Sequence, residues 1–156
     1  TASAGPSTNA NLSALSLSTG TLAPAFAANT TSYSATVPFT TSSITVTATK
    51  ADANATLQVR VNSGSYTALT SGSPSGSLAL NTGSNTIDVL VTAEDGTTTK
   101  TYTTTVTRTA ASTNADLSSL STAAGVFSPA FNAAVTSYSV SVANGVTSTT
   151  VTATVA

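Results

Sequence analysis

Charge is almost missing from this 156-residue sequence, which holds four basic and five acidic side chains and no histidine. With a net charge of −1 and no basic cluster, nothing attracts phosphate, so we predict that the chain binds no nucleic acid. Histidine and cysteine are both absent, so the usual pairings of a nucleophile with a base are missing despite abundant serine. We expect no enzymatic activity, no catalytic residues, and no cofactor or metal site.

Cysteine and long apolar runs are missing as well. Without cysteine there are no disulfides, an absence that agrees with an extracellular site without proving one. No apolar run reaches the roughly 18 residues that cross a bilayer, so we predict no membrane span. The first residues have neither the charged nor the apolar region of a signal peptide, and we interpret 1–7 as a linker inside a longer polypeptide.

Serine and threonine replace the lysine and glutamate that usually make the surface of a protein polar. Threonine is β-branched and favours extended backbone while its hydroxyl stays in water. Such a surface is polar but nearly uncharged, and it offers trypsin-like proteases four cleavage sites. These properties suit a secreted protein that is exposed to its surroundings.

An internal repeat is the most informative feature of the sequence. The segment 8–51 aligns without a gap with 113–156, at an offset of 105 and with 24 identities in 44 positions. A period of about a hundred residues exceeds the 20–50 of solenoid repeats and fits an independently folding sandwich domain. We predict a linker at 1–7, a complete sandwich at 8–108, a linker at 109–112, and a truncated second copy at 113–156.

Alternation of apolar and polar residues predicts about seven strands in the first copy. The first is irregular and is marked by Leu12, Leu15 and Leu17. The others are expected at 32–37, 43–49, 56–62, 77–80, 85–93 and 99–108. Asp88 is expected on an outward face, and Glu94-Asp95-Gly96 is expected to form a hairpin turn with a positive φ at the glycine. No segment has a helical period, so we predict an antiparallel β-sandwich of the Greek-key kind.

Two groups of residues carry a resemblance to a known family. The first group is Leu12, Leu15, Gly20, Leu22-Ala-Pro-Ala-Phe26, Thr31-Ser-Tyr33 and Val37. The second is Gly83-Ser-Asn-Thr-Ile87-Asp-Val89, Val91-Thr-Ala-Glu94-Asp-Gly96, Lys100-Thr-Tyr102 and Val106-Thr-Arg108. Together they resemble the bacterial cadherin-like β-sandwich domain, which is immunoglobulin-like. The resemblance implies a repeated module of secreted surface proteins, with spacer or adhesive roles and no catalytic residues.

Several binding and crosslinking sites have a rival structural interpretation. A junctional calcium ion would have Asp116 with Asn114, and Asn9 with Asn11 in the first copy, but strand-edge hydrogen bonding explains these side chains too. An amide crosslink would use Lys50 or Lys100, which we expect to be solvated at strand ends.

The threonine runs at 45–49 and 103–107 are taken as strand-forming residues of twisted sheets rather than as ice-binding ladders. A glycan site would use exposed aromatic rings, for which Tyr66 and Phe39 are the candidates. In the second copy, Phe127 occupies the position that matches Leu22. Glycosylation sequons occur at Asn11, Asn29 and Asn54.

A structural role is the function that the sequence favours, as a spacer, stalk or assembly unit of an extracellular surface protein or filament. The alternatives are an adhesion module that binds a glycan or a partner surface, and an accessory domain of a secreted enzyme.

The second copy carries an apolar face of its own. Its members are Leu117, Leu120, Phe131, Tyr138, Val142 and Val151. A patch of this size drives association when it is left in water. Either the chain continues, which is the simpler interpretation, or strands from a neighbouring chain complete the sandwich and build a homopolymer.

Overall fold

The computed structural model describes residues 5–156, so residues 1–4 of the predicted linker lie outside the described part. The described residues form β-strands and no helix, which confirms the predicted all-β class. The chain divides into two compact units, of which the first ends at Ala111 and the second spans Ser112–Ala156.

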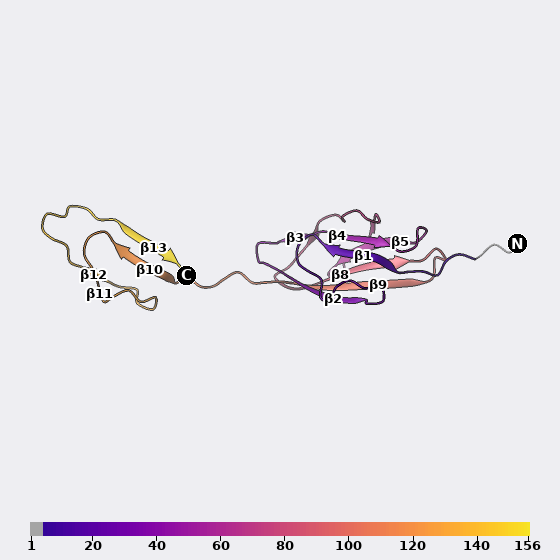
Figure 1. Cartoon of the computed structure of the whole chain (residues 1–156), viewed down its shortest axis with the longest axis horizontal. Helices are drawn as coiled ribbons and strands as arrows, with labels where there is room; N and C mark the ends of the chain where they lie inside the picture. The colour runs from indigo at the N-terminus through magenta and orange to yellow at the C-terminus, as the bar shows by residue number, and fades with distance from the viewer. Residues whose placement is uncertain (1–4) are drawn as a thin grey trace. The chain divides into compact units, whose positions relative to one another are not determined.

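The first unit holds the following strands: β1 (Leu12–Leu17), β2 (Ser32–Val37), β3 (Ser43–Ile44), β4 (Val46–Lys50), β5 (Thr56–Val61), β6 (Thr67–Leu69), β7 (Leu78–Ala79), β8 (Gly83–Thr92) and β9 (Thr99–Arg108). Five of them form one sheet in the order β2-β9-β8-β5-β6. The pairs β1-β4 and β3-β7 form the opposing layer, and Figure 1 shows β1 and β4 lying over β8, β9 and β2. This arrangement is the antiparallel sandwich that the alternation predicts, apart from one parallel pairing.

Alternating side chains fill the space between the two layers. In β8, Ile87, Val89 and Val91 are each at most 1% exposed, while the residues between them face the other way. Tyr102 and Val106 of β9 are fully buried beside them. Each aliphatic side chain removed from water in this way contributes about 1.5–3 kcal/mol of hydrophobic free energy. The core of the first unit is therefore complete.

The parallel pairing joins β2 to β9, from Ser32 with Thr103 to Val37 with Arg108. Its cause is a detour of the chain between β1 and β2. After Gly20 the chain runs back antiparallel to β2, as the bridge between Ala23 and Ser34 shows, and then reverses again. Two reversals leave β2 running in the same direction as β1 and β9. Alternation marks a strand but does not give its direction, so the sequence did not predict this pairing.

Two further differences concern short elements. The strand expected at 43–49 is split at Thr45, whose backbone N–H is bound by the Ser18 hydroxyl while its carbonyl accepts from the Ser18 N–H. Strand β6 was not predicted, because three residues between glycine- and serine-rich turns are too few to show alternation. The hairpin turn after β8 is confirmed, with φ of 70° at Gly96.

The second unit contains β10 (Leu117–Thr122), β11 (Phe127–Ser128), β12 (Ser139–Val140) and β13 (Val151–Val155). The β10-β13 pair has the register of β1-β4 shifted by 105 residues, so that Leu117 lies opposite Val155 as Leu12 lies opposite Lys50. The irregularity after the first pair recurs at the same place. The aligned sequences therefore fold in the same way, although the second unit has no counterpart of β5, β8 and β9 among the described residues.

Candidate functional site

The carboxylates of Glu94 and Asp95, in the turn between β8 and β9, accept hydrogen bonds from backbone N–H groups. Asp95 Oδ1 accepts hydrogen bonds from the N–H groups of Thr97 and Thr98 at 2.9 and 2.8 Å. These bonds, with that of the Thr98 hydroxyl first among them, lower the pKa of Asp95 to about 2. Glu94 Oε2 accepts from the N–H of Ser7 at 2.9 Å, and the Asp95 N–H donates to the Ser7 carbonyl at 3.1 Å. The turn therefore anchors the incoming chain.

The anchoring of Ser7 was not predicted, because its partners lie 87 residues further along the chain and no local pattern connects them. A second set of long-range hydrogen bonds lies at the other end of β9. The Arg108 guanidinium donates to the carbonyl of Phe39 from Nε and Nη2, at 2.9 and 2.7 Å, and to that of Leu80 from Nη1 at 2.9 Å. Both ends of the first sandwich are thus held by long-range polar contacts.

Both lysines are engaged rather than free in solvent. Lys50 Nζ donates to the Ala55 carbonyl at 2.7 Å, and Lys100 Nζ donates to Asn11 Oδ1 at 2.7 Å. Lys100 and Asn11 are the residue types of an amide crosslink. Within residues 5–156, however, the one ion pair is Arg60–Asp88, so no carboxylate lies within 4 Å of Lys100 to assist that chemistry. The contact acts as a hydrogen bond between β9 and the start of β1.

Asn9 and Asn11 before β1 make the same local contact as Asn114 and Asp116 before β10. Asn9 Oδ1 accepts from the Asn11 N–H at 3.0 Å, and Asn114 Oδ1 accepts from the Asp116 N–H at 2.9 Å. These are local turns of the backbone before a strand. In the described part of the chain, no group of three potential metal-ligating side chains comes together.

Asp88 lies on the outer face of the five-stranded sheet, as expected, yet its exposure is 7%. Arg60 Nε donates to its Oδ2 at 2.8 Å and the Thr103 hydroxyl donates to its Oδ1 at 2.8 Å. The same arginine lies over the ring of Tyr66, at 4.5 Å from its centroid. Arg108 lies over the ring of Phe39 at 4.9 Å. Tyr66 and Phe39 are the two rings expected to bind a glycan, and a guanidinium therefore covers one face of each.

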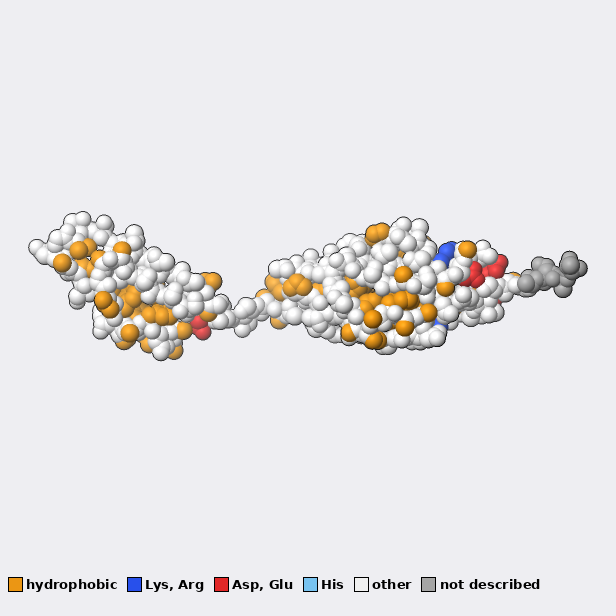
Figure 2. All heavy atoms as spheres, viewed as in Figure 1, with side chains coloured by type: hydrophobic (Ala, Val, Ile, Leu, Met, Phe, Trp, Pro, Cys, Tyr) orange, Lys and Arg blue, Asp and Glu red, His pale blue; other side chains and the backbone are white. Residues whose placement is uncertain are grey.

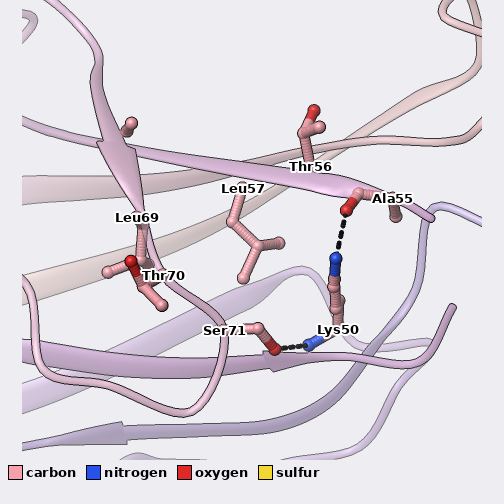
Figure 3. A pocket seen from close by; sticks show the side chains of 8 residues that line it. Lys50, Ala55, Thr56, Leu57, Leu69, Thr70 and Ser71 are labelled. Atoms are coloured by element: carbon pink, nitrogen blue, oxygen red, sulfur yellow. Dashed lines mark hydrogen bonds between the residues drawn. The ribbon is translucent and has the colours of Figure 1, made fainter. Parts of the chain in front are cut away.

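A cleft of about 400 Å³ opens at the edge between the two layers of the first unit. Figure 3 shows Leu57 and Leu69 extending into it and Lys50 spanning one end toward the Ala55 carbonyl. The Ser71 hydroxyl accepts from the backbone N–H of Lys50 at 3.1 Å. Lys50 is the one charged residue that lines the cleft, and the other lining side chains are aliphatic or carry a hydroxyl group.

The second unit presents an apolar surface that the first unit buries. The name open face is used below for six residues of the second unit: Leu117, Leu120, Phe131, Tyr138, Val142 and Val151. Val142 and Val151 are 47% and 64% exposed, whereas Val37 and Val46 at the matching positions are each 1% exposed. Two shallow pockets share Leu120 and Phe131, and Figure 2 shows hydrophobic side chains in patches across this unit. The open face is the strongest candidate for a binding surface.

Comparison with known proteins identifies the first unit. A family model for the cadherin-like beta sandwich domain matches residues 12–109. No curated protein matches the chain. None of the described residues forms a helix long and apolar enough to cross a membrane. Because the family match covers more than half of the chain, the protein belongs to the family of cadherin-like β-sandwich domains.

Proposed function

We propose that the chain is a non-catalytic spacer or assembly module of an extracellular bacterial surface protein or filament. Its family is a non-enzymatic structural fold whose domains are typically extracellular, which gives the chain a structural or adhesion-type role. The spacer role is supported above all by where the chain enters and leaves the first sandwich.

The chain enters and leaves the first sandwich at opposite ends. Ser7 is held at the β8-β9 turn by Glu94 and Asp95, and Arg108 is the last residue of β9. The ten residues of β9 span about 33 Å between these two points. Tension along the chain therefore runs parallel to the strands. It loads the hydrogen bonds of the β2-β9 and β1-β4 pairs together, in shear, rather than one after another.

The surface composition agrees with a role in an exposed stalk. The described residues hold one ion pair, so salt has few interactions to screen. On the side that Figure 2 shows, most of the first unit is uncharged, and the charged side chains visible there lie near its N-terminal end. Such a surface keeps its properties when the ionic strength of the surroundings changes.

Stretching single molecules tests the spacer role. The chain has no cysteine, so Thr8→Cys with Thr109→Cys gives two unique handles at opposite ends of the sandwich. We expect one cooperative event that lengthens the molecule by about 330 Å. The control is Thr82→Cys with Thr109→Cys, which pulls the β8-β9 pair apart from one end, where Gly83 lies opposite Arg108. This geometry should yield at a clearly lower force.

Equal forces in the two geometries would contradict the spacer role, as would gradual peeling of β1 at low force. The extracellular site is tested separately. In the organism that makes the protein, protease added to intact cells should reach the domain, whereas protection that ends only on lysis would contradict this site.

A further inference from the structure

We propose that Asn144 and Gly145 form a site of spontaneous covalent modification, at which the asparagine side chain loses ammonia and becomes a carboxylate. Asparagine followed by glycine occurs once in the sequence, and the pair lies in the second unit. The reaction needs water but no enzyme and no partner. It is independent of the spacer role proposed above, so either proposal can fail alone.

Asn144 and Gly145 lie at the centre of a β-turn. The backbone N–H of Val146 donates to the carbonyl of Ala143 at 2.9 Å, which closes the turn around them. All four residues are exposed. Asparagine followed by glycine is a common pair in turns. The side chain and the backbone nitrogen that react are therefore open to water.

The first unit contains the same turn at the matching positions. The N–H of Thr41 donates to the carbonyl of Pro38 at 3.0 Å, and Phe39 and Thr40 take the central places. Phe39 is 42% exposed although the core of the first unit is complete. The turn therefore lies at the surface in a complete sandwich as well. Phe39 has no amide to lose, so the modification is specific to the second copy.

The reaction begins when the backbone nitrogen of Gly145 attacks Cγ of Asn144. A bond forms between these two atoms, the nitrogen gives up its proton, and the side-chain amide group leaves as ammonia. The product is a cyclic imide. Water then adds to one of the two carbonyl groups of the ring and opens it. Opening at one carbonyl gives aspartate, and opening at the other gives isoaspartate, in which the main chain runs through the β-carbon.

The local structure offers little resistance to this attack. Glycine has no β-carbon to shield its nitrogen. Among the hydrogen bonds within residues 5–156, none involves the N–H of Gly145 or the side chain of Asn144. The attack requires the backbone of Asn144 to rotate out of the turn, which breaks the bond from Val146 to Ala143. Loss of one exposed hydrogen bond slows the reaction by about tenfold at most.

Asn62 shows what prevents the reaction in the first unit. It also lies in an exposed turn and is followed by a small residue, Ser63. Its Nδ2 donates to Asn85 Oδ1 at 2.9 Å, and its Oδ1 accepts from the N–H of Thr86 at 2.9 Å. Because both ends of this amide are held, Cγ cannot turn toward the next backbone nitrogen without losing both contacts.

The modification changes the second unit in two ways. Asp116 is the single charged side chain in residues 109–156, so a carboxylate at position 144 doubles the charge of this segment. Isoaspartate also adds a carbon atom to the main chain between β12 and β13. Both changes accumulate with the age of the molecule and distinguish older copies from newer ones.

The test incubates the full chain in warm neutral buffer, then unfolds it and digests it with trypsin. Cleavage after Arg108 releases residues 109–156 as one fragment, because no lysine or arginine follows. Mass spectrometry should show the gain that replaces an amide with an acid, located at Asn144 and divided between two products of equal mass. A peptide with the sequence of residues 139–150 gives the reference rate, and the folded chain should be slower by no more than about tenfold.

Gly145→Ala is the matched control. A β-carbon added at Gly145 has no atom within 4 Å, so the turn is kept, yet that carbon shields the nitrogen and most of the conversion should be lost. Asn62 should keep its amide in the folded chain and begin to convert in urea, whereas Asn144 should convert under both conditions.

An intact Asn144 in the folded chain, after the peptide has converted fully, would overturn the proposal. So would equal conversion in the Gly145→Ala chain, or conversion of Asn114 and Asn132 as fast as that of Asn144.

Discussion

Few polar side chains in the first sandwich are buried, and those that are buried have partners. Asn85 is 1% exposed, and its amide group bonds Asn81, Gly83 and the side chain of Asn62. Among the described residues, no buried side-chain nitrogen or oxygen atom lacks a hydrogen bond. Because an unpaired buried polar group costs about 1–3 kcal/mol, each of these contacts is a point where one substitution has a measurable effect.

Tyr102→Phe tests the most central of these contacts. Its hydroxyl joins β9 to the Leu12 N–H and to the Ala28 carbonyl, and the substitution leaves that buried N–H without a partner. We expect the free energy of unfolding to fall by about 1–3 kcal/mol, measured by urea denaturation. Tyr66→Phe is the matched control and should change it by less than about 0.5 kcal/mol. Equal effects would show that the Tyr102 hydroxyl does not tie the two layers.

Asp95 predicts a dependence of stability on pH. Its pKa of about 2 lies below the ordinary value, mainly because the Thr98 hydroxyl and backbone N–H groups bind the carboxylate. The unfolded chain then takes up a proton at a higher pH than the folded chain. The stability from Asp95 is therefore complete above about pH 4 and is lost as pH falls through about 2.

Urea denaturation between pH 5 and about pH 2 measures this contribution. In the wild-type chain the free energy of unfolding should decline across this interval, and Asp95→Asn should flatten the decline. An identical slope in the variant would contradict the role of this carboxylate in the turn.

At the scale of elements, the sequence predicts strands better than it predicts their partners. Strands β2 and β9 have the expected bounds, because five or more alternating residues lie between turn residues. The parallel pairing of β2 with β9 was missed, since it depends on the two reversals of the chain between β1 and β2. The short β6 was missed for lack of length.

The open face illustrates what a sequence repeat can predict about a site. Alignment alone indicates that Leu117 and Val142 correspond to core positions of the first unit, whereas Val142 is 47% exposed in the second. The pairing of Lys100 with Asn11 was not predicted, because it joins residues 89 apart.

Gly20→Ala tests the first reversal of the chain. Gly20 has φ of 89°, and a β-carbon there would meet the Thr36 carbonyl and a methyl of Val37, each at 3.2 Å. We expect a loss of about 1–3 kcal/mol in the free energy of unfolding, since alanine resists this backbone conformation. Gly76→Ala, where no atom lies within 4 Å of the added β-carbon, is the control. A loss of the same size in the control would contradict the argument.

At the scale of the whole molecule, the two units differ in what they bury rather than in how their matching strands pair. The first unit has a continuous core of 21 buried hydrophobic residues, from Ala10 to Val106. None of the described residues of the second unit is in that buried class. The first unit is thus a cadherin-like sandwich with a complete core, and the second unit exposes side chains that the first unit buries at the matching positions.

Hydrogen exchange of the full chain, followed amide by amide, tests this difference between the two units. We predict that amides of β8 and β9 exchange only through global unfolding of the first sandwich. Amides of β10 and β13 should exchange much faster, because the pair has no opposing sheet. Slow exchange in both units, with one common free energy of opening, would contradict the claim, as would fast exchange throughout β8 and β9.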